Sequence, residues 1–404
     1  MNSATTTSPT KLTAAVSRAA LTLTLLSALL LIAARPAQAQ TETVLYNFTG
    51  GSDGRNPYSR LTSDGAGNFY GTTFNGGVFA SGTVFELSPN PNGGWNETVL
   101  YSFTGGLDGS NPWFSPVIFD RKGNLYGTTY YGGPGGTGVV FQLSPAEGGW
   151  TETVLHGFAG GEDGVNPING LAMGAAGNLY GTTYQGGQQG DGVVFELSAS
   201  GGNWTEQVIY EGADTVWGGV TVDPSGNIFG ATPSWIFELS PNGNGGWSYE
   251  IIKKFNPGGK NGGPADTPVL DQAGNVYGTT VGGYSFGTVF KLSPGNKGKW
   301  TKQTLHHFAG GQRGDLPWPS VLIDAAGNVF GTTIQGGKSG DGVVYELSSS
   351  SGAGGYKEKV LCSFNGANGA QPWGGLILDS AGNIYGTTDV GGTSNAGTVF
   401  EVTP

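Results

Sequence analysis

The sequence has few of the residues on which most globular proteins rely for charge and chemistry. Only 12% of its 404 residues are charged, and it holds three His, two Met and one Cys, Cys362. The low charge excludes coiled coils and charge-rich disordered chains, and a single cysteine excludes an internal disulfide. Acidic residues outnumber basic ones by 29 to 18, so the net charge is −11. We therefore expect no nucleic-acid partner.

Glycine and proline are abundant instead, with 77 Gly and 21 Pro. Gly has no strict Gly-x-y period, which excludes collagen. Gly and Pro at this level also exclude long helices. The composition therefore indicates many short strands joined by tight turns.

The first 39 residues have the pattern of a signal peptide. Lys11 and Arg18 precede an apolar run at 19–34, and Ala37 to Ala39 form an A-x-A cleavage site. The run is short for a membrane span, and no second one follows. We expect residues 40–404 to be exported, to the periplasm or the extracellular space, as a monomer without a transmembrane anchor.

A repeat organises the rest of the chain. The pattern G-N-hydrophobic-[YF]-G-[TA]-T occurs seven times at intervals of about 52 residues, with its Asn at Asn68, Asn124, Asn178, Asn227, Asn275, Asn328 and Asn383. Each period holds four short apolar or alternating runs separated by turn residues, which indicates four strands. Seven such units predict an all-β fold, a single seven-bladed β-propeller at 40–404.

The phase of the repeat predicts how the ring closes. In the first unit the innermost strand falls at 59–64, and the outermost at 97–103. The chain begins with a strand of the outermost type, at 42–48, and ends with a third strand, at 398–402. We therefore predict that the N-terminal strand completes the last blade, which removes an exposed sheet edge.

The turn after each innermost strand is the most regular feature. Six of the seven turns begin with Asp, namely Asp64, Asp120, Asp223, Asp271, Asp324 and Asp379. Asp at the start of a type I turn accepts a bond from the backbone two residues on, and the following Gly takes the left-handed conformation. Repetition in nearly every blade favours a turn role over catalysis. The Gly of each Gly-Thr-Thr is predicted to mark a close backbone approach.

The phrase D-x-x-G-N-L-Y-G-T-T, followed by G-G and then by G-T-V-F-E-L, resembles the GloVer repeat. That tandem repeat occurs in exported bacterial proteins, often beside C-terminal sorting anchors. The resemblance covers residues 42–404, with a degenerate copy at 218–240 and no recognisable anchor. It implies a propeller-like extracellular protein and brings no catalytic residues.

Candidate catalytic residues are sparse. The chain has no P-loop, GxSxG or HExxH motif. His156, His306 and Cys362 fall on outermost strands where other copies have Tyr, so we predict tolerant surface positions. The GGxDGxNP loops hold Asp53, Asp108 and Asp163, for which a turn role is favoured over Ca²⁺ binding. We expect no cofactor and no metal.

One repeated feature suits a ligand. The loop that enters each blade ends in one residue that follows Pro in six copies, and in five copies it is aromatic: Tyr58, Trp113, Trp217, Trp318 and Trp373. Ile168 and Ala265 stand in the other two. These five are our predicted ligand-binding residues, gathered at one channel mouth; the alternative is burial between blades. A second set is predicted to pack at the rim: Trp95, Trp150, Trp204, Trp247, Trp300 and Tyr356.

Three functions remain open at this point. The first is a non-catalytic binding propeller for a glycan or another cell-envelope ligand. The second is an exported polysaccharide lyase or hydrolase with its site in the central channel, and the third is a structural surface protein. An enzyme should break its repeat symmetry with polar residues on the inner strands. These strands vary mainly among apolar residues, which favours binding.

Overall fold

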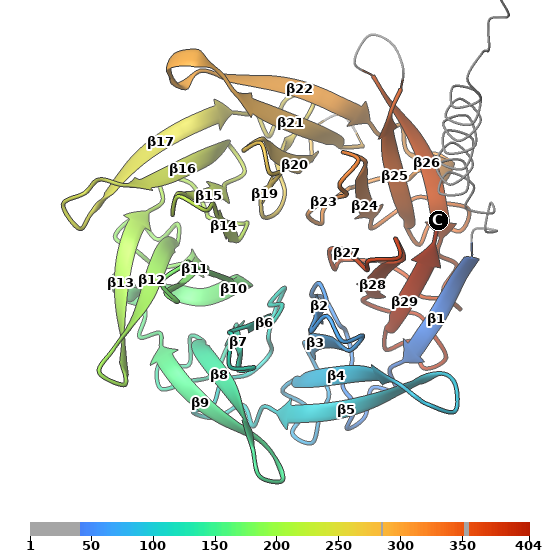
Figure 1. Ribbon diagram of the computed structural model, residues 1–404, viewed down its shortest axis with the longest axis horizontal. Helices are drawn as coiled ribbons and strands as arrows, with labels where there is room; N and C mark the ends of the chain where they lie inside the picture. The colour runs from blue at the N-terminus through green and yellow to red at the C-terminus, as the bar shows by residue number, and fades with distance from the viewer. Residues whose placement is uncertain (1–40, 284–285, 351–354) are drawn as a thin grey trace, which may run out of the picture.

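Seven small antiparallel sheets are arranged in a ring in the computed structural model, which describes residues 41–283, 286–350 and 355–404 (Figure 1). Six sheets have four strands and one has five. The predicted all-β, seven-bladed propeller is therefore confirmed. The predicted signal peptide, residues 1–39, lies outside the described residues.

Each blade runs from an inner strand at the channel to an outer strand at the rim. Blade one contains β2 (Thr62–Ser63), β3 (Phe69–Thr73), β4 (Thr83–Pro89) and β5 (Trp95–Ser102), and blade two contains β6 (Ile118–Phe119), β7 (Leu125–Thr129), β8 (Val139–Ala146) and β9 (Gly149–Gly157). Blade three contains β10 (Val165–Met173), β11 (Leu179–Gln185), β12 (Val193–Ser200) and β13 (Asn203–Glu211). Blade four contains β14 (Val220–Val222), β15 (Ile228–Ala231), β16 (Trp235–Pro241) and β17 (Trp247–Lys254).

The remaining blades follow the same plan, except that two short inner strands of blade five pair with one neighbour. Blade five contains β18 (Gly263–Pro264), β19 (Val269–Leu270), β20 (Val276–Val281), β21 (Thr288–Pro294) and β22 (Trp300–His307). Blade six contains β23 (Leu322–Ile323), β24 (Val329–Thr333), β25 (Val343–Ser349) and β26 (Tyr356–Ser363). Blade seven contains β27 (Ile377–Leu378), β28 (Ile384–Thr388) and β29 (Thr398–Thr403). The described residues also include three 3₁₀ turns, η1 (Gly161–Asp163), η2 (Asn296–Gly298) and η3 (Gly311–Arg313).

The two ends of the described chain meet in blade seven. β1 (Thr41–Asn47) pairs antiparallel with β29, in a register from Thr41 opposite Thr403 to Asn47 opposite Thr398. In Figure 1 the blue β1 lies beside the red β29. This pairing confirms the predicted closure by the N-terminal strand.

The core lies between blades, because each sheet packs its faces on its two neighbours. One cluster, for example, joins Phe48, Leu61 and Phe85 to Tyr385 and Val399 of the preceding blade. The rim tryptophans pack against these clusters as predicted, and Trp95 stacks on Phe69 at 5.4 Å between ring centroids.

The Gly of each Gly-Thr-Thr makes room for a ring rather than for backbone, which corrects our prediction. A Cβ placed on Gly127 would lie 2.6 Å from Cζ of Phe141, a fully buried ring on the neighbouring strand β8. A methyl group cannot fit at that distance. Each blade therefore packs a ring of its third strand over the glycine of its second.

The Asp turns form as predicted. In the first, the Asp64 carboxylate accepts hydrogen bonds from the Ala66 N–H at 2.7 Å and from the Asn68 N–H at 3.1 Å. The following Gly67 has a φ of 104°. The other five Asp residues make the same bond to the backbone two residues on. These carboxylates are therefore turn formers.

Candidate functional site

In five of the seven blades, the loop that enters the blade is hydrogen-bonded to the preceding blade just before the repeated position that follows Pro. In blade one, Asn56 has a φ of 58°, a conformation that Asn tolerates better than most residues. Its N–H donates to the carbonyl of Ala396 in blade seven at 2.9 Å. Asn111, Asn166, Leu316 and Gln371 repeat both the positive φ and the bond. These hydrogen bonds fix the direction in which the next two residues point.

The structure brings the five predicted aromatic residues together. Trp217, Trp318 and Trp373 follow one another with ring centroids 5.7 Å apart at each step. Phe114 continues the series, at 5.8 Å from Trp373 and 5.4 Å from Tyr58, and it also lies 5.5 Å from Trp113. We call these six residues the aromatic chain. All six are half-buried, so each is packed against its neighbours and keeps part of its surface accessible.

Sequence reasoning missed Phe114. It stands directly after Trp113, in the one entering segment that is a residue longer than the others. Counting back from the turn Asp of each unit reveals this extra residue. Ile168 and Ala265, the two non-aromatic members of the repeated position, are both buried and do not join the aromatic chain.

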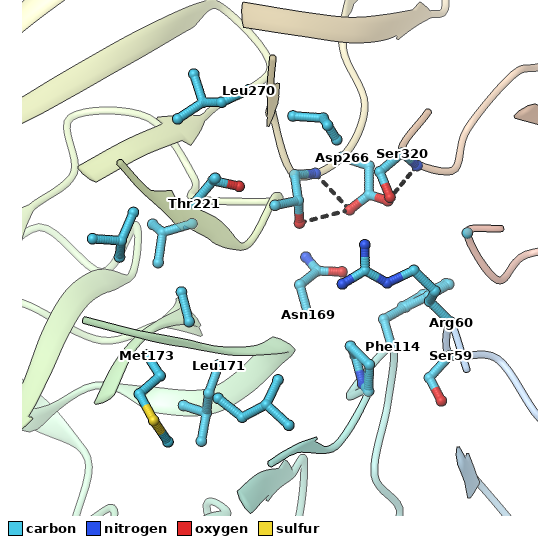
Figure 2. A pocket seen from close by; sticks show the side chains of 18 of the residues that line it. Ser59, Arg60, Phe114, Asn169, Leu171, Met173, Thr221, Asp266, Leu270 and Ser320 are labelled. Atoms are coloured by element: carbon cyan, nitrogen blue, oxygen red, sulfur yellow. Dashed lines mark hydrogen bonds between the residues drawn. The ribbon is translucent and has the colours of Figure 1, made fainter. Parts of the chain in front are cut away.

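A cavity of about 370 Å³ lies beside the aromatic chain, between the inner strands (Figure 2). Tyr58, Phe114 and Trp373 of the aromatic chain are among its lining residues. Apolar residues of blades two to five line its walls, among them Ile118, Leu171, Val222 and Leu270. Its polar lining includes Arg60, Asn169, Asp266 and Ser320.

The polar lining comes from positions where the repeat varies most. The residue five before the turn Asp is Ser, Asn, Gly or Pro in most blades, but it is Asp266 in blade five. The residue four before it is Arg60 in blade one and an uncharged residue in the others. The expectation that these segments vary mainly among apolar residues is therefore wrong at the mouth of the channel. Arg60 and Asp266 belong to different blades and are far apart in the sequence, so only the closed ring brings them to one cavity.

The Asp266 carboxylate is anchored by its surroundings. It accepts hydrogen bonds from the Thr267 N–H at 2.6 Å, the Thr267 hydroxyl at 3.2 Å and the Ser320 N–H at 2.7 Å. Burial raises the pKa of this carboxyl, and these bonds and the Arg60 charge act in the opposite direction. Figure 2 shows Arg60 and Asn169 pointing into the same space as Asp266.

Arg60 is the free charge of the cavity. The residue is exposed, and it makes no hydrogen bond or ion pair with the described residues. The surrounding channel walls lower the pKa of the guanidinium by desolvation, and Asp266 raises it. An arginine starts from a pKa above 12, so the group stays cationic at neutral pH.

A second repeated arrangement lies at the rim, where the outer strands of neighbouring blades meet. At the β1–β5 junction the Tyr46 hydroxyl donates to Asp53 at 3.1 Å, and at the β5–β9 junction Tyr101 donates to Asp108 at 2.9 Å. The Asp53 carboxylate also accepts from the Thr49 N–H at 2.7 Å. These bonds within the loop support the turn role that we favoured over Ca²⁺ binding.

His156, His306 and Cys362 occupy the Tyr position at three other junctions. Their predicted surface location is wrong for Cys362 and only partly right for the two histidines, because the face of the outer strand packs on the next blade. The side chains of His156 and His306 are only 20% and 13% exposed, and Cys362 is buried. His156 Nε2 lies 2.9 Å from Asp163 Oδ1.

The junctions also hold a glutamate from the next outer strand. At the β1–β5, β5–β9 and β9–β13 junctions, burial and the neighbouring Asp raise the pKa of Glu97, Glu152 and Glu206 to about 7. One carboxylate oxygen of each is buried without a hydrogen-bond partner among the described residues. Near neutral pH each of these groups is therefore partly protonated.

The comparisons with known proteins agree with the propeller fold. A family model described as the Gloeobacter/Verrucomicrobia repeat matches residues 31–151, 90–235 and 232–404. A search of curated proteins finds no match. None of the helices among the described residues is long and apolar enough to cross a membrane.

Several solved structures share the fold at low sequence identity. Two extracellular domains of putative hybrid two-component systems from B. thetaiotaomicron match at 12% and 14% identity, with TM-scores of 0.55 and 0.56, over 89% and 90% of this chain. This chain spans about two fifths of the length of those domains, 39% and 41%. A putative 6-phosphogluconolactonase from Bacteroides uniformis matches at 15% identity and a TM-score of 0.51, over 76% of this chain and 87% of its own.

Proposed function

The chain belongs to the Gloeobacter/Verrucomicrobia repeat family and folds as a seven-bladed propeller, and we propose from this premise that it is an exported, non-catalytic binding protein. The proposed ligand is a glycan of the cell envelope or its surroundings. It binds at the channel mouth, across the aromatic chain and over the cavity that Arg60 and Asp266 line.

The aromatic chain is the observation that carries this proposal. Flat, half-buried rings give an apolar platform, which suits the apolar face of a sugar ring, and the packed side of each ring keeps it rigid. Ligand sites in proteins combine such apolar surface with a few polar groups that fix orientation. Arg60, Asn169 and Asp266 supply a cation, an amide and a carboxylate within the same cavity. These groups match the hydroxyl and carboxyl substituents of sugars.

The lining of the cavity favours binding over hydrolysis. Most glycoside hydrolases use two carboxyl groups on either side of the bond that they cleave. Asp266 is the only carboxylate among the described residues that line the cavity. Its oxygens already accept three hydrogen bonds, which suits a fixed acceptor more than a proton shuttle.

Export rests on two observations of different kinds. The first is the sequence pattern of a signal peptide at residues 1–39. The second is that the propellers from B. thetaiotaomicron, which share this fold, are described as extracellular domains. Fractionation of cells that express the full chain, with the N-terminus of the product sequenced, tests this part of the proposal. A product found in the cytoplasm with residues 1–39 attached would contradict it.

A glycan array with the purified protein tests the binding function. We expect retention of a defined set of glycans, and loss of that retention in Trp318→Ala and Trp373→Ala. Trp150→Ala is the matched control, because Trp150 packs at the rim on β9. It should keep the ligand at a temperature where the variant is folded.

Two results would contradict the proposal. One is the absence of any retained glycan, and the other is retention that survives both channel-mouth substitutions. Release of reducing ends from a retained polysaccharide would instead support the lyase or hydrolase alternative.

A further inference from the structure

The β9–β13 junction differs from its relatives at two positions at once. His156 stands where β1 and β5 have Tyr46 and Tyr101. Ala159 stands where the corresponding loops have Thr49 and Thr104, whose hydroxyls donate to Oδ1 of Asp53 and Asp108 at 2.5 Å. Asp163 Oδ1 therefore has no threonine donor, and the imidazole of His156 faces it instead, at 2.9 Å.

A third ligand atom approaches from the next blade. Oε1 of Glu206, on β13, is buried and has no hydrogen-bond partner among the described residues. One ligand atom from each of His156, Asp163 and Glu206 lies within 4.8 Å of the other two. The remaining oxygen of Asp163 accepts from the Ala159 N–H at 2.6 Å, and the His156 ring packs edge-on against Phe158 at 4.7 Å. Two of the three groups are therefore held in place by contacts outside the set.

We propose that His156, Asp163 and Glu206 bind a divalent transition metal ion, with Zn²⁺ as the best match. One imidazole and two carboxylates are ligands that zinc accepts, and three protein ligands leave a fourth position for water. Tetrahedral coordination requires ligand atoms about 3.4 Å apart. The His156–Asp163 pair, at 2.9 Å, must therefore open by about half an ångström, and Glu206 must adjust its side chain to complete the set. His156 and Asp163 are each about one fifth exposed, so an ion can enter from solvent.

The β22–β26 junction has a cationic side chain at the equivalent place. It also combines a histidine, His306, with a buried glutamate, Glu358. Here Arg313 replaces the loop Asp, and its Nη1 lies 3.5 Å from Oε2 of Glu358, as does His306 Nε2. The chain thus supplies its own positive charge at one histidine junction. At the β9–β13 junction the loop keeps its Asp, so His156 faces two carboxylates, Asp163 and Glu206.

Isothermal titration of the chelator-treated protein with Zn²⁺ tests the proposal. We expect one equivalent to bind, and His156→Tyr to abolish it. That variant restores the residue found at the β1–β5 and β5–β9 junctions, so it should fold normally. Glu206→Gln keeps the shape of the side chain and should weaken zinc binding at least tenfold. His306→Tyr is the control and should leave the zinc isotherm unchanged.

A variant that gains a site gives a test that does not depend on whether the other variants lose zinc binding by misfolding. Tyr101→His combined with Thr104→Ala gives the β5–β9 junction the two changes that distinguish the β9–β13 junction. This double variant should bind a second equivalent of Zn²⁺. The proposal is overturned if the wild-type protein binds no zinc at millimolar concentration. It is also overturned if His156→Tyr and Glu206→Gln both bind as the wild-type protein does.

Discussion

In every blade, the inner turn and the segment at the channel mouth are a few residues apart in the sequence. The turn is nearly the same from blade to blade, whereas the segment is not. Six turns use the same Asp, with the same bond to the backbone two residues on. The segments just before them differ in every blade, and they place Arg60, Phe114 and Asp266 around one cavity. In this propeller, the repeat accounts for what holds each blade together and for most of the aromatic chain, whereas the two charged groups of the proposed ligand site are departures from the repeat.

Ring closure is the part of the regular architecture on which everything else depends. Deletion of β1, Thr41–Asn47, exposes the edge of β29 and opens the ring. We expect this variant to lose cooperative unfolding and to aggregate. Thermal unfolding monitored by circular dichroism, together with size-exclusion chromatography, checks the result. A monomer with an unchanged melting temperature would contradict the closure.

The glycine of the second strand should give the next largest effect. Gly127→Ala forces a methyl group against the ring of Phe141, and overpacking of this kind costs about 2 kcal/mol. Urea unfolding measures the loss. Phe141→Leu in the same chain shortens the opposing side chain, so the double variant should cost less than the sum of the two single variants. Strict additivity would show that the two residues do not meet.

A turn Asp should matter less than the glycine. The Asp324 carboxylate accepts from the Ala326 N–H at 2.9 Å and from the Asn328 N–H at 2.8 Å. Asp324→Ala removes both bonds at a solvent-facing turn, and we expect a loss of about 1 kcal/mol in urea unfolding. Glycan retention should not change. A loss of retention with normal folding would mean that the regular turns also serve the ligand.

The junction glutamates should show a small effect that depends on pH. Burial and Asp53 raise the pKa of Glu97 from its usual 4.5 to about 7. The folded state therefore binds more protons than the unfolded state between these values, and stability falls as pH rises through this window. Glu97→Gln removes this contribution, so its melting temperature relative to wild type should increase from pH 5 to pH 8. Glu147→Gln, at an exposed turn, should show no such trend.

The sequence was informative wherever a feature repeats. Seven copies of one motif predict seven blades, and the position of the first strand in the motif predicts the β1–β29 pairing. The aromatic set that includes Trp318 and Trp373 was found for the same reason.

Unrepeated features could not be predicted in this way. Arg60 and Asp266 are about 200 residues apart, and nothing local links them until the ring closes. The burial of His156 was missed for a related reason. An outer strand was taken as exposed, although its face packs against the loop and strand of the next blade.

The most direct test is to replace one residue that departs from the repeat with the residue found at the same position in another blade. Arg60→Ser gives blade one the residue that blade six has at this position, Ser320. Equilibrium binding of the best glycan from the array, measured beside thermal unfolding, compares this variant with Asp324→Ala. For Arg60→Ser we expect at least a tenfold loss of affinity at an unchanged melting temperature. For Asp324→Ala we expect a lower melting temperature and an unchanged affinity. Unchanged affinity in Arg60→Ser would contradict the claim that the charged residues that depart from the repeat belong to the ligand site.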